Sequence, residues 1–138
     1  MAITESVSGE LTAAARRAAA HAYCPYSRFP VGAAVLTSSG EIFAGCNVEN
    51  ASYGLTICAE RNAVFQAATH GQGRLVIQAV VVYTPTPQPT APCGACRQVI
   101  NEFGPDAEII SVCDGTAVIR AGLANLLPEA FGPGNLAR

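Results

Sequence analysis

The sequence predicts an α/β fold, a three-layer α/β/α sandwich in which a mixed β-sheet lies between helical layers. The run VIQAVVVY at 76–83 is apolar and β-branched, as is typical of a central strand that is buried on both faces. Helical and strand-like segments alternate on both sides of it. Because the chain has 138 residues, 50% of them hydrophobic, we expect one compact domain over 1–138.

Each predicted element has a local signal. Four segments have helical composition: 8–22, 58–70, 93–103 and 121–131. Four segments are strand-like: 31–38, 41–50, 76–83 and 108–114. We expect Ser8 and Thr56 to cap the first two helices, and a turn at Ser39–Gly40 to join the first two strands as a hairpin. Residues 84–92 hold four prolines, which predicts a stiff loop that leads into the helix at Cys93.

Charge and composition exclude several classes of protein. A net charge of −2 disfavours nucleic-acid binding, which needs clustered basic residues. All eight basic residues are arginine, which excludes Schiff-base chemistry on lysine. No apolar window is long enough to span a membrane, and the N-terminus is acidic where a signal peptide would be basic, so we expect a cytoplasmic protein. In a reducing compartment, its six cysteines are expected to be buried thiols or metal ligands.

Cys93 and Cys96 form a C-x-x-C motif at the start of a predicted helix. Residues three apart share a helix face, so the two thiols can bind one metal ion. A redox pair uses the same spacing at a helix start, and simple burial is a third interpretation. This motif alone leaves the three open.

Cys58 favours zinc, because it opens another predicted helix and adds a third thiol. Three thiolates leave one position open on a tetrahedral zinc ion, as in catalytic rather than structural sites. His21 and His70 are not in a paired ligand spacing with the cysteines, and we interpret both as ordinary surface or core residues.

Glu60 and Arg61 lie two and three residues after Cys58. A glutamate beside a zinc-bound water can take its proton and pass it to a substrate, although Glu60 can meet Cys58 only beyond the helix end. An arginine can offset the negative charge of three thiolates. The plainer alternatives are an acid favoured by the helix dipole and a solvated surface arginine.

Five segments together resemble the small homotetrameric cytidine deaminases of pyrimidine salvage: FPVGAA (29–34), NVENASYG (47–54), TICAERNA (56–63), PCGACRQV (92–99) and LLPEAFGP (126–133). They occur in the family's order and span nearly the whole chain. The resemblance implies a cytidine deaminase-like fold with about five strands, a homotetramer, and one zinc ion per subunit on the three cysteines. It also implies that Glu60 carries protons.

The resemblance further implies four substrate contacts within one subunit. Phe29 would lie against the nucleoside, Asn47 and Glu49 would hydrogen-bond the ribose 3′-hydroxyl, and the Ala59 backbone would bind the pyrimidine. Asn47 and Glu49 alternate at a strand end, where a paired amide and carboxylate can hold a sugar diol; turn formation is the alternative interpretation.

Three more residues would complete the pocket of a neighbouring subunit, as the resemblance implies: Ala51 and Tyr53 near the 5′-hydroxyl, and Phe131 stacked on the base. Core packing is the alternative for the aromatic residues.

The expected reaction is hydrolysis of cytidine and 2′-deoxycytidine to uridine and 2′-deoxyuridine with release of ammonia. Two alternatives remain: a zinc deaminase of another aminopyrimidine nucleoside, such as an aminoacylnucleoside antibiotic, and a non-catalytic zinc or dithiol module.

Overall fold

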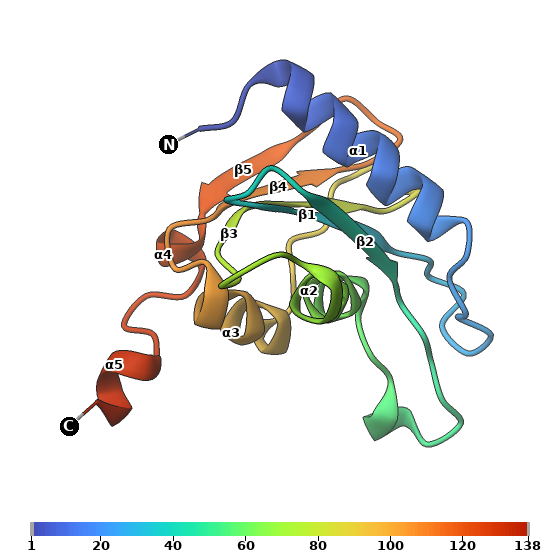
Figure 1. Ribbon diagram of the computed structural model, residues 1–138. Coiled ribbons are helices and arrows are strands. Elements are labelled where there is room, and N and C mark those ends of the chain that lie inside the picture. Colours follow the sequence, from blue (N-terminus) through green and yellow to red (C-terminus); the bar gives the residue numbers. More distant parts are fainter. Residues whose placement is uncertain (1, 138) are drawn as a thin grey trace.

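A five-stranded sheet forms the centre of the computed structural model, which describes residues 2–137. Helix α1 covers one face of the sheet, and α2 and α3 cover the other (Figure 1). The strands are β1 (Gly32–Thr37), β2 (Ile42–Cys46), β3 (Ile77–Tyr83), β4 (Glu108–Val112) and β5 (Ile119–Gly122). The helices are α1 (Glu5–Ala19), α2 (Ala59–His70), α3 (Gly94–Phe103), α4 (Leu123–Leu126) and α5 (Pro133–Leu136). The three-layer α/β/α prediction is confirmed.

The sheet is mixed, with the order β2-β1-β3-β4-β5. Strand β1 is antiparallel to both β2 and β3, β3 is parallel to β4, and β5 is antiparallel to β4. The apolar run predicted as a central strand is β3, which lies in the middle of the sheet. Its parallel partner is reached through the 84–92 loop and α3, and this crossover carries the chain past the carboxyl end of β3.

Two glycines let helices approach the β1–β2 hairpin on opposite sides. A Cβ atom at Gly32 would lie 1.8 Å from the carbonyl oxygen of Ala15 in α1. A Cβ atom at Gly45 would lie 2.6 Å from the backbone nitrogen of Ala63 in α2. Because real Cβ contacts are never that short, only glycine permits this packing. The second contact sets the position of α2, whose N-terminus contributes to the site described below.

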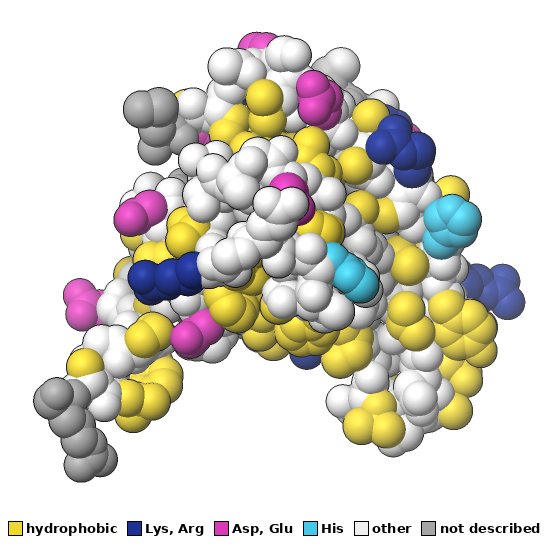
Figure 2. All heavy atoms as spheres, viewed as in Figure 1, with side chains coloured by type: hydrophobic (Ala, Val, Ile, Leu, Met, Phe, Trp, Pro, Cys, Tyr) yellow, Lys and Arg dark blue, Asp and Glu magenta, His cyan; other side chains and the backbone are white. Residues whose placement is uncertain are grey.

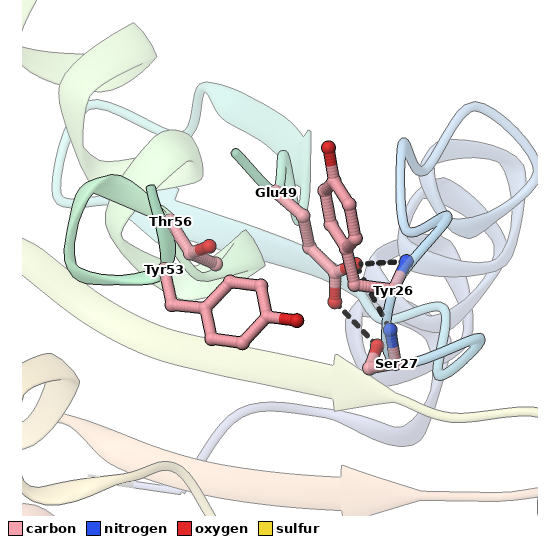
Figure 3. A pocket seen from close by; sticks show the side chains of 5 residues that line it. All are labelled: Tyr26, Ser27, Glu49, Tyr53 and Thr56. Carbon is pink, nitrogen blue, oxygen red and sulfur yellow. Dashed lines mark hydrogen bonds between the residues drawn. The ribbon is translucent and has the colours of Figure 1, made fainter. Parts of the chain in front are cut away.

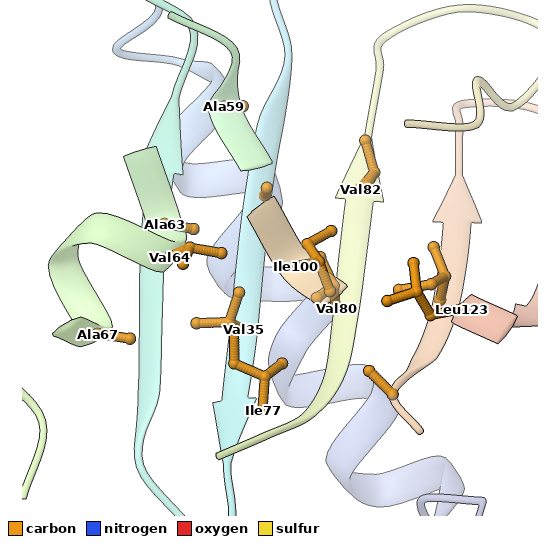
Figure 4. Packing of buried hydrophobic residues seen from close by; sticks show 13 residues of the cluster. Val35, Ala59, Ala63, Val64, Ala67, Ile77, Val80, Val82, Ile100 and Leu123 are labelled. Carbon is orange, nitrogen blue, oxygen red and sulfur yellow. The ribbon is translucent and has the colours of Figure 1, made fainter. Parts of the chain in front are cut away.

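Two buried clusters fill the space between the layers. One joins the sheet to α2 and α3, with Val35 and Val80 of the strands against Val64 and Ile100 of the helices (Figure 4). The other joins the opposite face of the sheet to α1, where Leu11 is fully buried. Burial of each such aliphatic side chain contributes about 1.5–3 kcal/mol, so both helical layers are held mainly by apolar contact.

Both predicted helix caps are wrong. Helix α1 begins after Thr4, whose Oγ1 accepts a hydrogen bond from the backbone nitrogen of Val7 at 3.2 Å, while Ser8 is buried within the helix. Helix α2 has Cys58 in the N-cap position, and Thr56 instead accepts a hydrogen bond from the backbone nitrogen of Asn50.

The predicted C-terminal helix over 121–131 is also wrong in extent. Residues 119–122 form the edge strand β5, α4 spans only Leu123–Leu126, and the further short helix α5 was not predicted. The pattern of this region is weak because β5 is short and largely exposed.

Two segments project from the side of the molecule that carries α2 and α3. One is the loop 47–57, which contains the 3₁₀ helix η1 (Tyr53–Leu55), and the other is the C-terminal segment that ends with α5 (Figure 1). Hydrophobic side chains gather on both projections (Figure 2). Within residues 2–137, no helix combines the length and apolar character that crossing a membrane requires.

Candidate active site

Two helix N-termini bring three cysteines together. Cys58 and Cys93 occupy the N-cap positions of α2 and α3, and Cys96 lies in the first turn of α3. The Cys58 and Cys93 sulfurs are 3.8 Å apart, those of Cys93 and Cys96 are 3.5 Å apart, and all three lie within 4.8 Å of one another. Sulfurs bound to one tetrahedral zinc ion at about 2.3 Å would be about 3.8 Å apart, so the three thiols fit zinc. Among residues 2–137, no histidine, acid or fourth cysteine joins this group.

The surroundings of the thiols favour their charged form at Cys58. A hydrogen bond from Cys96 and a second from Arg61 lower the pKa of Cys58 to about 5. The Arg61 Nη2 atom lies 3.4 Å from the Cys58 sulfur, and this contact raises the pKa of the guanidinium, which stays charged. The hydrogen bond between Cys96 and Cys58 also raises the pKa of Cys96, so Cys96 keeps its proton while Cys58 is charged. Positive helix ends add to the stabilisation of thiolates.

Glu60 lies in the first turn of α2, with its side chain almost fully buried. Burial raises the pKa of its carboxyl group to about 7, because a charged carboxylate loses its hydration there. A carboxyl group with that pKa can both accept and donate a proton near neutral pH, as general acid-base catalysis requires.

A cavity of about 390 Å³ joins Glu60, Cys58 and Cys93 to the four substrate contacts predicted within one subunit. Its walls come from segments 27–31, 47–49, 56–60 and 90–93, together with Val82 of β3. This volume is in the range of small-molecule sites.

Asn47 and Glu49 form one wall of the cavity with Phe29. The Asn47 side chain is buried; its Oδ1 accepts a hydrogen bond from the Val31 backbone nitrogen, and its Nδ2 donates to the Phe29 carbonyl, both at 2.9 Å. One Nδ2 hydrogen remains for a ligand. Phe29 is partly exposed, as a residue that contacts a ligand must be.

Ala59 and Ala91 also line the cavity. Ala59 is the first residue of α2, so its N–H has no acceptor within the helix and can donate to a bound molecule. Ala91 belongs to the loop just before Pro92 and Cys93.

Ala51, Tyr53 and Phe131 do not line this cavity, and all three are exposed. Tyr53 lines an adjoining hollow with Glu49 (Figure 3). The Phe131 carbonyl oxygen accepts hydrogen bonds from Gln98 and Asn101 of α3, at 2.8 and 3.3 Å. The structure therefore does not bring these three residues to the pocket of the same chain. His21 and His70 are exposed and lie outside the thiol group.

Two residues near the site were not predicted. Ser27 lines the cavity and hydrogen-bonds the Glu49 side chain, a tertiary contact that has no local sequence signal. Arg97 donates from Nε to the Pro92 carbonyl at 2.7 Å and from Nη1 to the Leu126 carbonyl at 2.9 Å. It thereby fixes the peptide that precedes Cys93. Its position directly after the C-x-x-C motif could have indicated a supporting role.

The comparisons with known proteins agree with this geometry. The family model of the cytidine and deoxycytidylate deaminase zinc-binding region matches residues 6–112. A cytidine deaminase from Sporosarcina psychrophila is 43% identical over 137 residues, covering 92% of this chain and 93% of the relative. One from Mycobacterium tuberculosis is 47% identical over 124 residues, covering 90% and 89%. The crystal structure of cytidine deaminase from Burkholderia pseudomallei matches with a TM-score of 0.84 at 46% identity, covering 94% of this chain and all of that one. The chain belongs to the cytidine and deoxycytidylate deaminase family.

Proposed function

We propose that this protein is a zinc-dependent cytidine deaminase that hydrolyses cytidine and 2′-deoxycytidine to uridine and 2′-deoxyuridine, with release of ammonia. The observation that carries the proposal is one cavity that combines thiols of the three-cysteine group, the buried Glu60 carboxyl group, and the Asn47–Glu49 pair. The relatives named cytidine deaminase, at 43–47% identity, support the choice of substrate.

Cys58, Cys93 and Cys96 would hold one zinc ion per subunit. Zinc in such a site supplies Lewis acidity, which makes hydroxide available from water near neutral pH. Three thiolates over-neutralise a divalent ion, and the Arg61 guanidinium beside Cys58 offsets the excess negative charge.

Glu60 is assigned the proton transfers. Its carboxylate takes a proton from the attacking water and delivers it to N3 of the pyrimidine. After the hydroxide has added to C4, Glu60 takes the proton of the new C4 hydroxyl and passes it to the amino group, which leaves as ammonia while C4 becomes a carbonyl. The Ala59 N–H would bind the pyrimidine, and the Ala91 carbonyl would accept a hydrogen bond from the departing amino group.

The sugar is assigned to the wall of the cavity that Asn47, Glu49 and Phe29 form. Asn47 offers one free N–H and Glu49 an acceptor oxygen, a combination that suits a hydroxyl group that both accepts and donates. Phe29 would lie against the nucleoside and exclude water from one side of it.

We further propose a homotetramer, in which Ala51, Tyr53 and Phe131 complete the pocket of a neighbouring subunit. The hydrophobic side chains on the two projecting segments support this assembly (Figure 2). The whole chain 1–138 is taken as one catalytic domain, and its six free cysteines favour a reducing, cytoplasmic location.

The direct test uses the purified, zinc-loaded protein with cytidine and with 2′-deoxycytidine. Loss of cytidine absorbance should be matched one to one by uridine and by ammonia, measured separately. If neither nucleoside is consumed while zinc is bound, the proposed function is wrong. Four protein ligands on the zinc would then favour a structural zinc module.

A further inference from the structure

The turn at residues 24–28 presents two adjacent backbone N–H groups to the side chain of Glu49. A hydrogen bond from the Arg28 nitrogen to the Cys24 carbonyl, at 2.9 Å, closes the turn. The Tyr26 and Ser27 nitrogens both donate to Oε1 of Glu49, at 2.9 and 3.1 Å (Figure 3). Successive N–H groups of a turn form a concavity that binds anions, and here the anion is a carboxylate of the chain itself.

The Ser27 hydroxyl binds the other carboxylate oxygen. It donates a hydrogen bond to Oε2 of Glu49 (Figure 3). It also accepts one from the backbone nitrogen of Phe29, at 3.1 Å. Because the Phe29 amide already supplies a proton to the Ser27 oxygen, the hydroxyl proton is free to point at Glu49. One serine side chain therefore joins two residues that line the cavity.

These contacts determine what Glu49 has left to offer a ligand. A carboxylate oxygen has about two acceptor positions. Both positions of Oε1 are occupied by backbone N–H groups, and one position of Oε2 is occupied by the Ser27 hydroxyl. Hydrogen bonds from Ser27, above all that of its hydroxyl, hold the pKa of Glu49 below its usual range, so the group is a charged acceptor. One acceptor position remains, which suits a single hydroxyl donor.

We propose that Ser27 is a positioning residue for nucleoside binding: its hydroxyl fixes the Glu49 carboxylate so that one oxygen lone pair is directed at a sugar hydroxyl. This inference rests on the proposed function, which supplies the nucleoside. Removing the hydroxyl would leave the two backbone contacts to Oε1 but would free Oε2 and the Phe29 amide. Ser27 is exposed, so its replacement by alanine creates no cavity in the core.

The test compares cytidine with 3′-deoxycytidine, which lacks the hydroxyl assigned to Glu49, in the zinc-loaded protein. For Ser27→Ala, we expect kcat/KM on cytidine to fall about tenfold, mainly through KM, because a hydrogen bond to a charged group is lost. On 3′-deoxycytidine, the change should stay below about twofold, since the group that Glu49 would bind is absent. Ser27→Thr keeps the hydroxyl and should restore most of the cytidine rate.

Ser39→Ala is the matched control. The Ser39 hydroxyl also donates to a glutamate, Oε1 of Glu41 at 3.0 Å, but at the β1–β2 turn and outside the cavity. Ser39→Ala should leave kcat/KM unchanged on both cytidine and 3′-deoxycytidine. An equal loss on both nucleosides in Ser27→Ala, or no loss on cytidine, would overturn the proposal.

A second readout does not depend on turnover. The Glu49 carboxyl carbon, assigned with the variant Glu49→Gln, can be titrated by NMR, and its pKa should rise in Ser27→Ala and return in Ser27→Thr. An unchanged pKa would overturn the positioning of Glu49 by Ser27. A parent protein that consumes no cytidine would instead overturn the proposed function, while the titration still tests the contact between these two residues.

Discussion

The Nη2 atom of Arg61 lies 3.4 Å from the sulfur of Cys58, so a permanent positive charge touches the three-thiol group. Replacing Arg61 by glutamine should leave the thiols in place but remove the positive charge that offsets the negative charge of the thiolates. We expect Arg61→Gln to lower kcat/KM on cytidine or zinc affinity by about 10- to 100-fold, as supporting residues of metal sites do. Steady-state rates and zinc affinity by competition with a chelator measure the two effects.

Arg17→Gln, on the exposed face of α1, is the control for this change. Equal rates and zinc affinities in Arg61→Gln, Arg17→Gln and the parent would show that Arg61 is only a surface arginine.

Removing a thiol should remove the metal. Because Cys58, Cys93 and Cys96 are the three ligands available in this group, Cys96→Ser should bind less than about a tenth as much zinc at micromolar concentrations. Cys113→Ser should keep its zinc, since Cys113 is buried elsewhere, against the Pro87 and Ala117 carbonyls, each 3.5 Å from its sulfur. Metal analysis of the dialysed proteins measures the zinc content of each variant. Full zinc content in Cys96→Ser would refute the ligand set.

Zinc removal should abolish activity before it unfolds the protein. The two apolar clusters hold α1, α2 and α3 against the sheet without a metal, so we expect the far-UV circular dichroism to persist after chelation. The melting temperature should fall, because a ligand that binds only the folded state stabilises it by mass action. Activity should return with added zinc. A melting temperature that does not depend on zinc would contradict a site that joins α2 and α3.

The approach of α2 to the hairpin should make Gly45 sensitive to substitution. A Cβ atom there would overlap the Ala63 backbone, so we expect Gly45→Ala to lower the free energy of unfolding by about 1–3 kcal/mol. Gly9→Ala is the matched control: Gly9 lies inside α1, where an added Cβ would meet no other part of the protein within 4 Å. It should raise that free energy by about 0.5–1 kcal/mol, as alanine favours helix. Urea unfolding curves measure both changes, and a neutral Gly45→Ala would contradict the packing.

The fold could be predicted where the signal is local. The apolar run of β3 and the Ser39–Gly40 turn each depend on neighbouring residues, and both are confirmed. Strand β5 escaped prediction because a four-residue, largely exposed edge strand has no clear hydrophobic period. The sequence predicts Thr56 as a cap because threonine is a good one, but Cys58 takes that position and its thiol thereby reaches beyond the helix end.

The site, too, could be predicted from the sequence only in part. The cysteines could be grouped from sequence because each stands at a predicted helix start, and the structure brings both starts together. The Ser27–Glu49 contact could not be predicted, because it joins side chains 22 residues apart through a turn whose shape depends on the folded chain. Arg97 likewise acts through carbonyl groups of two other segments.

We propose that Glu60 moves protons at a zinc site of which it is not a ligand. The most direct test of this role measures zinc content and cytidine turnover together in Glu60→Gln, which keeps the size of the side chain but cannot exchange protons as a carboxyl group does. We expect one zinc per chain, as in the parent, and a kcat lower by about 100-fold or more. Glu102→Gln, an exposed change on α3, should match the parent in both. Full zinc content with near-parental turnover in Glu60→Gln would show that Glu60 does not carry the protons.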